Sequence, residues 1–247
     1  KDLNFQTISS PLGTQLPQAV GAAYVNKLGN YPGITVTYFG EGAASEGDFH
    51  AAMNFASTLK APLLFICRNN GWAISTPSDE QYTGDGVAGR GNAYGIPALR
   101  VDGGDALAMY HATKFARDQV AKTQSPMVIE AMSYRTGHHS TSDDSSRYRT
   151  IDEMKEWKAR DPITRFQIWL EGQGWWTAEE EASLRADARK EVMKVLDSSE
   201  REPKHPSSEL VTDVFDEIPP HLEKQYREIR ELAEQHKHQF PNDIPIQ

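Results

Sequence analysis

The stretch ITVTYFGEGAASEGDFHAAMNFASTLKAPLLFICRNNG, residues 34–71, decides the fold. It begins with a β-branched run at 34–39 and ends with an apolar run at 61–68, and both patterns are typical of buried strands. The segment 46–59 between them predicts a helix, with Ser45 as N-cap and Asp48 in the first turn. A strand, a helix and a strand in this order predict a parallel β-α-β unit with a right-handed crossover.

Working outward from this unit, the pattern predicts further elements of the same sheet. A helix is expected at 12–27 before the unit, and a helix at 105–122 and a third strand at 126–134 after it. The polar segment 136–150 has no periodicity and predicts a loop. These elements predict an α/β domain over residues 1–150, in which helices flank a parallel sheet.

Beyond residue 150 the composition becomes that of charged helices. Asp161 followed by proline predicts a helix start, Thr177 begins a capping box, and helical charge patterns cover 180–200 and 219–237. We therefore expect a helical C-terminal extension over 151–247, packed on the sheet or on a partner.

Composition limits the classes of function. The 247 residues include 38% hydrophobic residues, enough for a sizeable core, and a net charge of -9 disfavours nucleic acid and anionic membranes as main partners. The single cysteine, Cys67, excludes a disulfide framework and favours a reducing compartment. The longest apolar run is too short for a membrane span, and the start at Lys1 predicts a processed or truncated chain.

Two polar clusters follow the first two predicted strands directly. Gly40, Glu41 and Gly42 follow the first strand, and the cluster 68–71 follows the second. In parallel sheets, ligands bind at the carboxyl ends of strands, so these clusters can face one site. Glycines let backbone amides approach a phosphate, and Glu41 with Asn70 offers oxygen ligands for Mg²⁺, so we expect a diphosphate and Mg²⁺ site. A lone Gly-Glu-Gly would be only a tight turn, and the second cluster favours the ligand site.

The stretch from Gly40 to Thr76 resembles the thiamine-diphosphate motif of alpha subunits of heterotetrameric 2-oxo acid dehydrogenases, a glycine-acid-glycine followed by two asparagines. The segments ISSPLGTQLPQAVGAAY and YRTGHHSTSDDSSRYR are similar to the branched-chain 2-oxo acid dehydrogenase alpha subunit in particular. This resemblance covers about the whole chain and implies a thiamine-diphosphate-binding fold. It also implies that the chain is the C-terminal part of such a subunit.

The resemblance carries ligand roles onto named residues. It implies that Mg²⁺ binds Glu41, Asn70 and the carbonyl of Trp72, where Trp replaces a more usual Tyr. It implies that Arg68 and the amides of Gly42 and Ala43 hold the diphosphate. It implies that the cofactor as a whole contacts a larger set, namely Leu12, Gly40, Glu41, Gly42, Ala43, Arg68, Asn70 and His139. A second set matches a K⁺ site, namely Ser9, Pro11, Thr14 and Gln15. Without the resemblance, the segment 9–15 would be read as a helix cap, and Leu12 as a core residue.

The loop 136–150 carries the implied catalytic and regulatory residues. His139 matches a histidine that supports acyl transfer, a task suited to a group that titrates near neutrality. A histidine in a polar loop is more often only solvated, and we expect His138 to be solvated in this way. Ser140 matches a regulatory phosphoserine, whose phosphate would repel nearby acids. We expect Asp143 or Asp144 to pair with three residues that anchor the loop, namely Arg135, Tyr148 and Arg149.

The activity implied is oxidative decarboxylation of branched-chain 2-oxo acids with transfer of the acyl group to lipoamide, in catabolism of valine, leucine and isoleucine. Implied partners are a beta subunit in an α2β2 heterotetramer, a lipoyl-bearing acyltransferase core, and a regulatory kinase and phosphatase. The implied location is the mitochondrial matrix, or alternatively a bacterial cytoplasm. Two other readings stay open: a pyruvate or acetoin dehydrogenase alpha subunit, and a truncated, non-catalytic interaction module. A dinucleotide-binding protein is disfavoured because no G-x-G-x-x-G follows a predicted strand.

Overall fold

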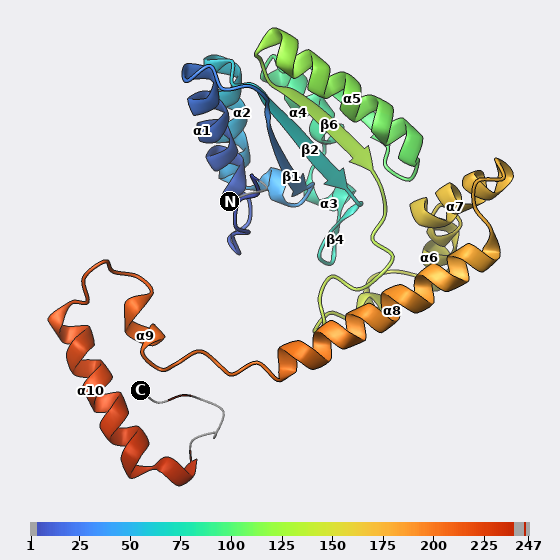
Figure 1. Ribbon diagram of the computed structural model, residues 1–247. Helices are drawn as coiled ribbons and strands as arrows, with labels where there is room; N and C mark the ends of the chain where they lie inside the picture. Colours follow the sequence, from blue (N-terminus) through green and yellow to red (C-terminus); the bar gives the residue numbers. More distant parts are fainter. Residues whose placement is uncertain (1–3, 240–244, 246–247) are drawn as a thin grey trace. The chain divides into compact units, whose positions relative to one another are not determined.

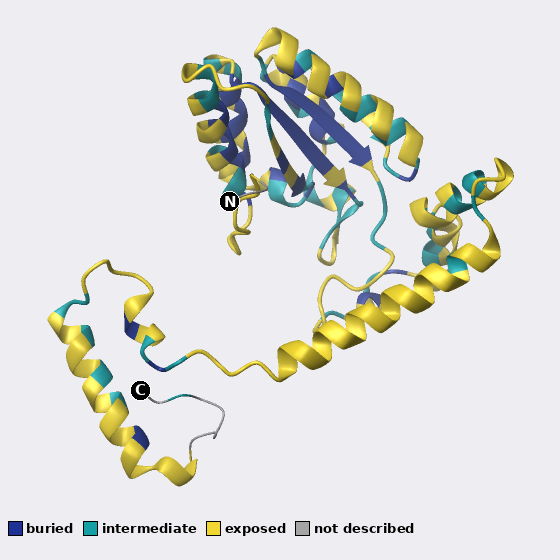
Figure 2. Ribbon diagram, viewed as in Figure 1, coloured by how far each residue is buried: buried dark blue, intermediate teal, exposed yellow. Residues whose placement is uncertain are grey.

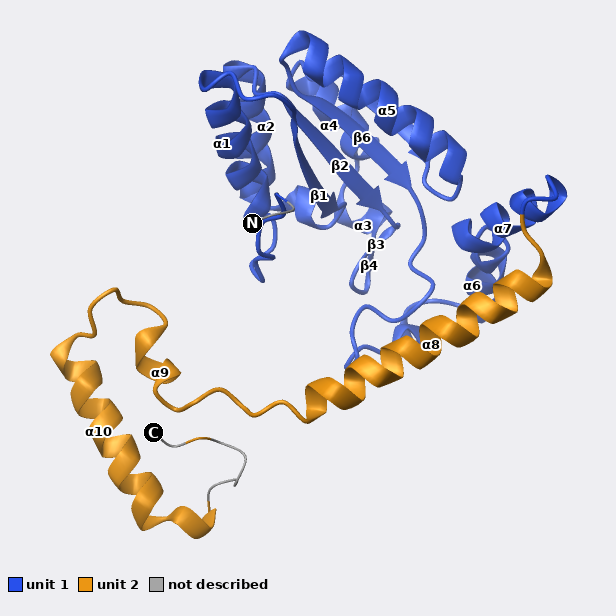
Figure 3. Ribbon diagram, viewed as in Figure 1, with its two compact units in different colours: residues 1–175 blue, residues 176–247 orange. Residues whose placement is uncertain are grey.

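The computed structural model describes residues 4–239 and residue 245. The chain divides into two compact units, one up to Trp175 and one from Trp176 onward (Figure 3). The change in composition predicts a domain boundary at residue 150. In the structure the boundary between the units lies later, because the helices between 151 and 175 group with the first unit by their contacts.

A four-stranded parallel sheet forms the centre of the first unit. Its strands are β1 (Thr35–Gly40), β2 (Leu63–Asn69), β5 (Ala98–Asp102) and β6 (Met127–Met132), in the order β1-β2-β6-β5. Figure 1 shows β1, β2 and β6 side by side. All neighbouring pairs are parallel. The predicted α/β class and the β-α-β unit are therefore confirmed. The third predicted strand, β6, is not the last strand of the sheet, because β5, which the sequence does not predict, pairs with its outer side.

Helices cover both faces of this sheet, as the sequence predicts. Helices α1 (Gln15–Leu28), α2 (Gly47–Leu59) and α4 (Gly86–Ala93) contribute to one hydrophobic cluster, whereas α5 (Ala106–Thr123) contributes to the other. Figure 2 shows the buried residues concentrated on the strands and on the inner sides of these helices. Strand β2 joins the two clusters, since Leu63 and Phe65 pack on the first and Leu64 and Ile66 on the second. A strand buried on both faces reads as a continuous apolar run.

Phe49 on α2 gives a direct test of this core. Its side chain is 0% exposed and packs against Phe39 with ring centroids 5.6 Å apart, whereas Phe55 on the same helix is 58% exposed. We expect Phe49→Ala to lower the free energy of unfolding by about 3 to 5 kcal/mol, because it leaves a cavity. Phe55→Ala should change it by less than about 0.5 kcal/mol. Urea unfolding of both variants checks this, and equal effects would contradict the assigned core.

The start of α2 differs from the prediction. The helix begins at Gly47 with Glu46 as N-cap, and no side chain caps it. Ser45 instead ends a short 3-10 turn, η1 (Ala43–Ser45), and its hydroxyl accepts a hydrogen bond from Gln81 at 2.9 Å. Ser45 as N-cap was therefore wrong, because the residues after the first strand form this turn before the helix begins.

The remaining elements are short or helical. The short ones are the hairpin β3 (Trp72–Ala73) and β4 (Thr76–Pro77), helix α3 (Ser78–Gln81), and the 3-10 turns η2 (Ser145–Arg147) and η3 (Lys237–Gln239). The C-terminal helices are α6 (Ile151–Lys158), α7 (Pro162–Gly172), α8 (Ala178–Glu200), α9 (Glu209–Thr212) and α10 (Pro220–Gln235). The predicted helical C-terminal region, the Asp161 cap and the Thr177 capping box are confirmed. No helix within the described residues is long and apolar enough to cross a membrane.

Candidate functional site

The two polar clusters predicted at the strand ends lie side by side at one edge of the sheet. Strands β1 and β2 run parallel, with Gly40 opposite Arg68, so the residues after each strand emerge at the same edge. Glu41 follows β1 directly, and Asn70 follows β2 directly. The structure therefore brings together the two stretches that were expected to share a ligand.

Glu41 is a fully buried carboxylate with one unpaired oxygen. Its Oε2 accepts a hydrogen bond from the backbone amide of Asn70 at 3.0 Å, whereas Oε1 has no partner among the described residues. Burial raises the pKa of Glu41, and the hydrogen bond from Asn70 opposes this rise without cancelling it. Because buried oxygens are normally paired, the unpaired Oε1 fits a ligand of a cation such as Mg²⁺.

The turn after β2 is fixed by its own asparagine side chains. Oδ1 of Asn69 accepts from the amide of Gly71, and Oδ1 of Asn70 accepts from the amide of Trp72, both at 3.1 Å. Gly71 adopts a φ of 82°, which favours glycine. Within the described ranges, no group of three or more His, Cys, Asp or Glu side chains is arranged so that it could hold a metal ion. The predicted Mg²⁺ set is of another kind, because it combines the Glu41 carboxylate with amide and carbonyl oxygens.

The turn after Glu41 presents two backbone amides. The first amide that donates a hydrogen bond within this turn is that of Ala44, which donates to the carbonyl of Glu41 at 3.2 Å. The amides of Gly42 and Ala43 come before it in the chain, at the start of the turn. A Cβ on Gly42 would lie 3.0 Å from the Cβ of Ala73, and the close packing there favours glycine. Amides at the start of a turn or helix are suited to binding phosphate, so Gly42 and Ala43 fit their predicted role.

Two side chains hold the carbonyl side of the same turn. Gln81 donates to the carbonyl of Gly42 at 3.3 Å, and Arg90 donates to the carbonyl of Ala44 at 2.5 Å. Because the Gly42 carbonyl and the Ala43 amide belong to one peptide and point in opposite directions, the bond from Gln81 turns the amide of Ala43 away from Gln81. Arg68, the other predicted diphosphate contact, is exposed near the end of β2.

The residues predicted to bind K⁺ are partly gathered. Oγ1 of Thr14 lies 3.1 Å from Oγ of Ser9 and 3.1 Å from the carbonyl oxygen of Pro11. The side-chain amide of Gln15 instead donates to the carbonyl of Tyr38 at 3.0 Å. Hydroxyl and carbonyl oxygens in such a group suit a large, weakly hydrated cation, so three of the four residues fit this role.

Leu12 and His139 are both exposed. The Leu12 side chain is 69% exposed, so it is not a core residue of the described chain. The backbone amide of His139 donates to Asp143 at 2.8 Å, which fixes the main chain at this position, and its side chain is exposed. These two positions are therefore available to a ligand or partner.

A hydrogen-bonded chain anchors the His139 loop. Tyr148 donates to Asp143 at 2.6 Å, and Arg135 donates both to the Tyr148 hydroxyl at 2.8 Å and to the carbonyl of Ile74 at 2.7 Å. The Tyr148 hydroxyl and the His139 amide both lower the pKa of Asp143. The expected pairing of Arg135 with an aspartate is thus indirect, because Tyr148 stands between Arg135 and Asp143.

Arg149 and His138 hold the base of the loop. Arg149 donates to the carbonyls of Arg135 and Gly137, so it does not pair with an aspartate as expected. The backbone amide of Ser145 donates to Nδ1 of His138 at 3.0 Å, which makes Nδ1 an acceptor. The prediction that His138 is merely solvated was therefore wrong, since its side chain joins residue 138 to Ser145 on the other side of the loop.

Tyr148→Phe is expected to loosen this loop. It removes the hydroxyl that joins Asp143 to Arg135 and leaves the ring contact with Trp72, whose centroid lies 5.3 Å away. We expect cleavage within 136–150 by a protease to become severalfold faster, because local opening requires fewer hydrogen bonds to break. Tyr110→Phe, at an exposed tyrosine of α5, is the matched control and should be neutral. Equal cleavage rates in the two variants would contradict the anchor.

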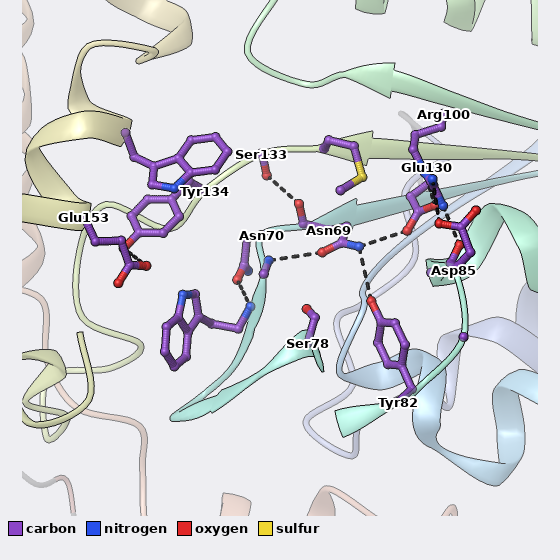
Figure 4. Close-up of a pocket in the computed structure, with 16 residues that line it drawn as sticks. Asn69, Asn70, Ser78, Tyr82, Asp85, Arg100, Glu130, Ser133, Tyr134 and Glu153 are labelled. Carbon is purple, nitrogen blue, oxygen red and sulfur yellow. Dashed lines mark hydrogen bonds and ion pairs between the residues drawn. The ribbon is translucent and has the colours of Figure 1, made fainter. Parts of the chain in front are cut away.

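A buried polar network lies beside the turn that follows β2, and the sequence patterns did not predict it. The carboxylate of Glu130, in the middle of β6, accepts hydrogen bonds from Asn69 at 2.9 Å and from Arg100 at 3.1 Å. A cavity of 330 Å³ lies next to it, lined in part by Asn70 and Trp72 (Figure 4). The available signal was a lone acid inside the apolar strand sequence MVIEAM.

The sequence of this chain matches the family described as dehydrogenase E1 component over residues 1–208. The chain belongs to the dehydrogenase E1 component family. Among its relatives, the mitochondrial 2-oxoisovalerate dehydrogenase subunit alpha of Dictyostelium discoideum is 52% identical over 248 residues, which is 100% of this chain and 55% of the relative. The human subunit of the same name is 51% identical over 244 residues, with 98% and 55% covered. The resemblance to this kind of subunit is thereby confirmed.

Plant relatives of this E1 component match to a similar degree. The mitochondrial 2-oxoisovalerate dehydrogenase subunit alpha 2 of Arabidopsis thaliana is 49% identical over 245 residues, which is 99% of this chain and 52% of the relative. The chain therefore spans about half the length of the curated relatives it matches. An X-ray structure described as a thiamin diphosphate-dependent enzyme of Mycobacterium smegmatis aligns with 51% of this chain and 23% of its own, at 20% identity and a TM-score of 0.42. This likeness is too weak to add to the assignment.

Proposed function

We propose that this chain forms part of the alpha subunit of a branched-chain 2-oxo acid dehydrogenase. The activity is that of 3-methyl-2-oxobutanoate dehydrogenase, which decarboxylates the oxo acid and transfers the acyl group to lipoamide. The buried Glu41, with one oxygen unpaired beside the Asn70 turn, is the observation that carries the proposal. The relatives named 2-oxoisovalerate dehydrogenase subunit alpha are 52% and 51% identical in sequence to this chain, and this supports branched-chain oxo acids over pyruvate or acetoin as the substrate class.

The chain's own residues would hold Mg²⁺ and a diphosphate. Glu41 would supply the carboxylate ligand, and Asn70 and the carbonyl of Trp72 would complete the protein's share. The amides of Gly42 and Ala43 would donate to the diphosphate. Bound thiamine diphosphate would supply the carbanion and the electron sink that decarboxylation of a 2-oxo acid needs. The second cation, K⁺, would bind near Thr14, whose hydroxyl lies beside two other oxygens.

His139 and Ser140 would act from the anchored loop. The exposed imidazole of His139 can move a proton to or from the lipoyl sulfur during acyl transfer, because a ring nitrogen of histidine can either donate or accept a proton. Ser140 lies next to it, with its hydroxyl 3.1 Å from that of Ser142. A phosphate on Ser140 would add negative charge close to Asp143, and the repulsion would oppose the closed loop.

The proposed activity requires further chains. A beta subunit would complete the site in an α2β2 heterotetramer, a lipoyl-bearing acyltransferase core would accept the acyl group, and a kinase and phosphatase would act on Ser140. The relatives named as mitochondrial support the mitochondrial matrix as the location, with a bacterial cytoplasm as the alternative.

The test is release of CO₂ by the full-length alpha chain assembled with a beta subunit. Thiamine diphosphate, Mg²⁺ and an artificial electron acceptor are supplied, and 3-methyl-2-oxobutanoate is compared with pyruvate. We expect kcat/KM for the branched acid to be higher by at least about tenfold, since extra methyl groups in a fitted pocket contribute on that scale. A preference for pyruvate would move the assignment to a pyruvate enzyme, and no turnover by a well-formed tetramer would favour a non-catalytic module.

A further inference from the structure

The mechanism proposed above does not use Glu130, a fully buried carboxylate near the candidate site. Both of its oxygens are saturated with hydrogen bonds. Oε1 accepts from the side chain of Asn69 and the amide of Val87, each at 2.9 Å, and Oε2 accepts from the amide of Ala88 at 3.0 Å and from Arg100 at 3.1 Å. These donors outweigh the cost of burial and lower the pKa of Glu130, so the group is held as a carboxylate.

The bond from Asn69 leads directly to the turn that carries the proposed ligands. Nδ2 of Asn69 donates to Glu130, and Oδ1 of the same side chain accepts from the amide of Gly71. The carbonyl of Asn69 also accepts from the amide of Ser133 at 2.7 Å, just beyond β6. Asn69 is therefore fixed by β6 through both its side chain and its backbone, as Figure 4 shows. Asn70 and Trp72 follow within three residues.

The packing around Glu130 allows little freedom. A Cβ on Gly86 would lie 2.5 Å from a Glu130 oxygen, and Gly86 has a φ of 72°, so the chain entering α4 closes on the carboxylate. Arg100 is held by a second acid, Asp85, at 2.9 Å, but the Asp85 side chain is 87% exposed and does not contact Asn69. Glu130 is thus a rigid acceptor between α4, β5 and the turn after β2.

We propose that Glu130 is a positioning residue for the Mg²⁺ and diphosphate site, acting through Asn69 to hold the turn that carries Asn70 and Trp72. This inference rests on the proposed function for its ligand. Partners that orient metal ligands commonly contribute 10- to 100-fold to metal affinity, although they do not touch the metal.

Glu130→Gln is the test variant. Its side-chain NH₂ group would face two of the four donors in either orientation, so the network, and with it Asn69, must shift. Asp85→Asn is the matched control, because it removes a charged partner of Arg100 and leaves the hydrogen bond between Asn69 and Glu130 in place. Asn69→Ala is a second variant that removes the link itself while leaving Glu130 in place. All are made in the full-length alpha chain assembled with a beta subunit.

Two readouts are measured. The first is amide hydrogen exchange of residues 69–74 without any cofactor, compared with exchange in the rest of the sheet. The second is the Mg²⁺ concentration that gives half-maximal binding of thiamine diphosphate, by calorimetry. We expect Glu130→Gln and Asn69→Ala to speed exchange locally and to raise this concentration about 10- to 100-fold. Asp85→Asn should change it less than about fivefold, as exposed ion pairs contribute little. In the Glu130→Gln variant, excess Mg²⁺ should restore most of kcat.

The outcomes separate this inference from the proposed function. Unchanged exchange at 69–74 in Glu130→Gln, or an effect of Asp85→Asn as large, would overturn the positioning role. A variant that combines Glu130→Gln with Asn69→Ala should need no more Mg²⁺ for half-maximal binding than Asn69→Ala alone. Additive increases in this concentration would show that Glu130 acts by another route. If the wild-type tetramer binds no Mg²⁺ and thiamine diphosphate, the proposed function fails, and the exchange measurement still decides whether Glu130 orders the turn.

Discussion

Replacing Glu41 by alanine is expected to abolish Mg²⁺-dependent binding of thiamine diphosphate. The variant removes the one carboxylate of the proposed ligand set, whose Oε1 is buried and unpaired. We expect affinity to fall by roughly 100-fold or more, since loss of an anionic ligand exceeds loss of a group that only orients a ligand. Calorimetric titration of the full-length alpha chain assembled with a beta subunit measures it, and CO₂ release should fall in parallel.

Stability gives an independent check on the Glu41 variant. Burial raises the pKa of Glu41, so the folded chain carries its ionised form at a cost when no cation is bound. Glu41→Ala should therefore leave the melting temperature without cofactor unchanged or higher, as is common for functional sites. Glu46→Ala is the matched control, because Glu46 is exposed and its side chain does not cap α2. Full binding in Glu41→Ala, or an equal loss in Glu46→Ala, would contradict the assignment.

Replacing His139 by alanine is expected to give the second large effect. The loss should fall on acyl transfer to a lipoyl domain, by about 100- to 10,000-fold, the usual contribution of a proton-transferring side chain. Binding of thiamine diphosphate should change much less, because the backbone bond from His139 to Asp143 keeps the loop closed. A single-turnover assay with isolated lipoyl domain separates the two steps.

The neighbouring histidine provides the control for this experiment. His138 accepts a hydrogen bond from the amide of Ser145 through Nδ1, and an asparagine oxygen can take over this role. We expect His138→Asn to keep most of the acyl transfer. If the two variants lose activity equally, His139 contributes to loop structure and not to proton transfer.

The parts of the fold that the sequence predicted are those with a local signature. Strand β2 is buried on both faces and is continuously apolar, and α2 between β1 and β2 has helical spacing, so the β-α-β unit could be read directly. Strand β5 has the sequence ALRVD, with a charge at its centre, and α4 is rich in glycine, so neither carries such a signature. Both form because β6 and Glu130 give them partners.

The same distinction holds for the candidate site. Glu41 and Asn70 were predicted because each follows an apolar strand, and strand ends meet by topology. The anchoring role of Tyr148 was expected, but its position between Arg135 and Asp143 depends on side-chain geometry that spacing does not encode. Glu130 was missed because its significance arises only when β6 lies beside β2, with Asn69 within hydrogen-bonding distance.

The most direct test of the central claim is calorimetric titration of thiamine diphosphate into the full-length alpha chain assembled with a beta subunit, with and without Mg²⁺. The proposed function predicts one site per alpha chain that requires Mg²⁺ and is lost in Glu41→Ala. Binding that is independent of Mg²⁺, or that persists in Glu41→Ala, would contradict the assignment of the site at the ends of β1 and β2.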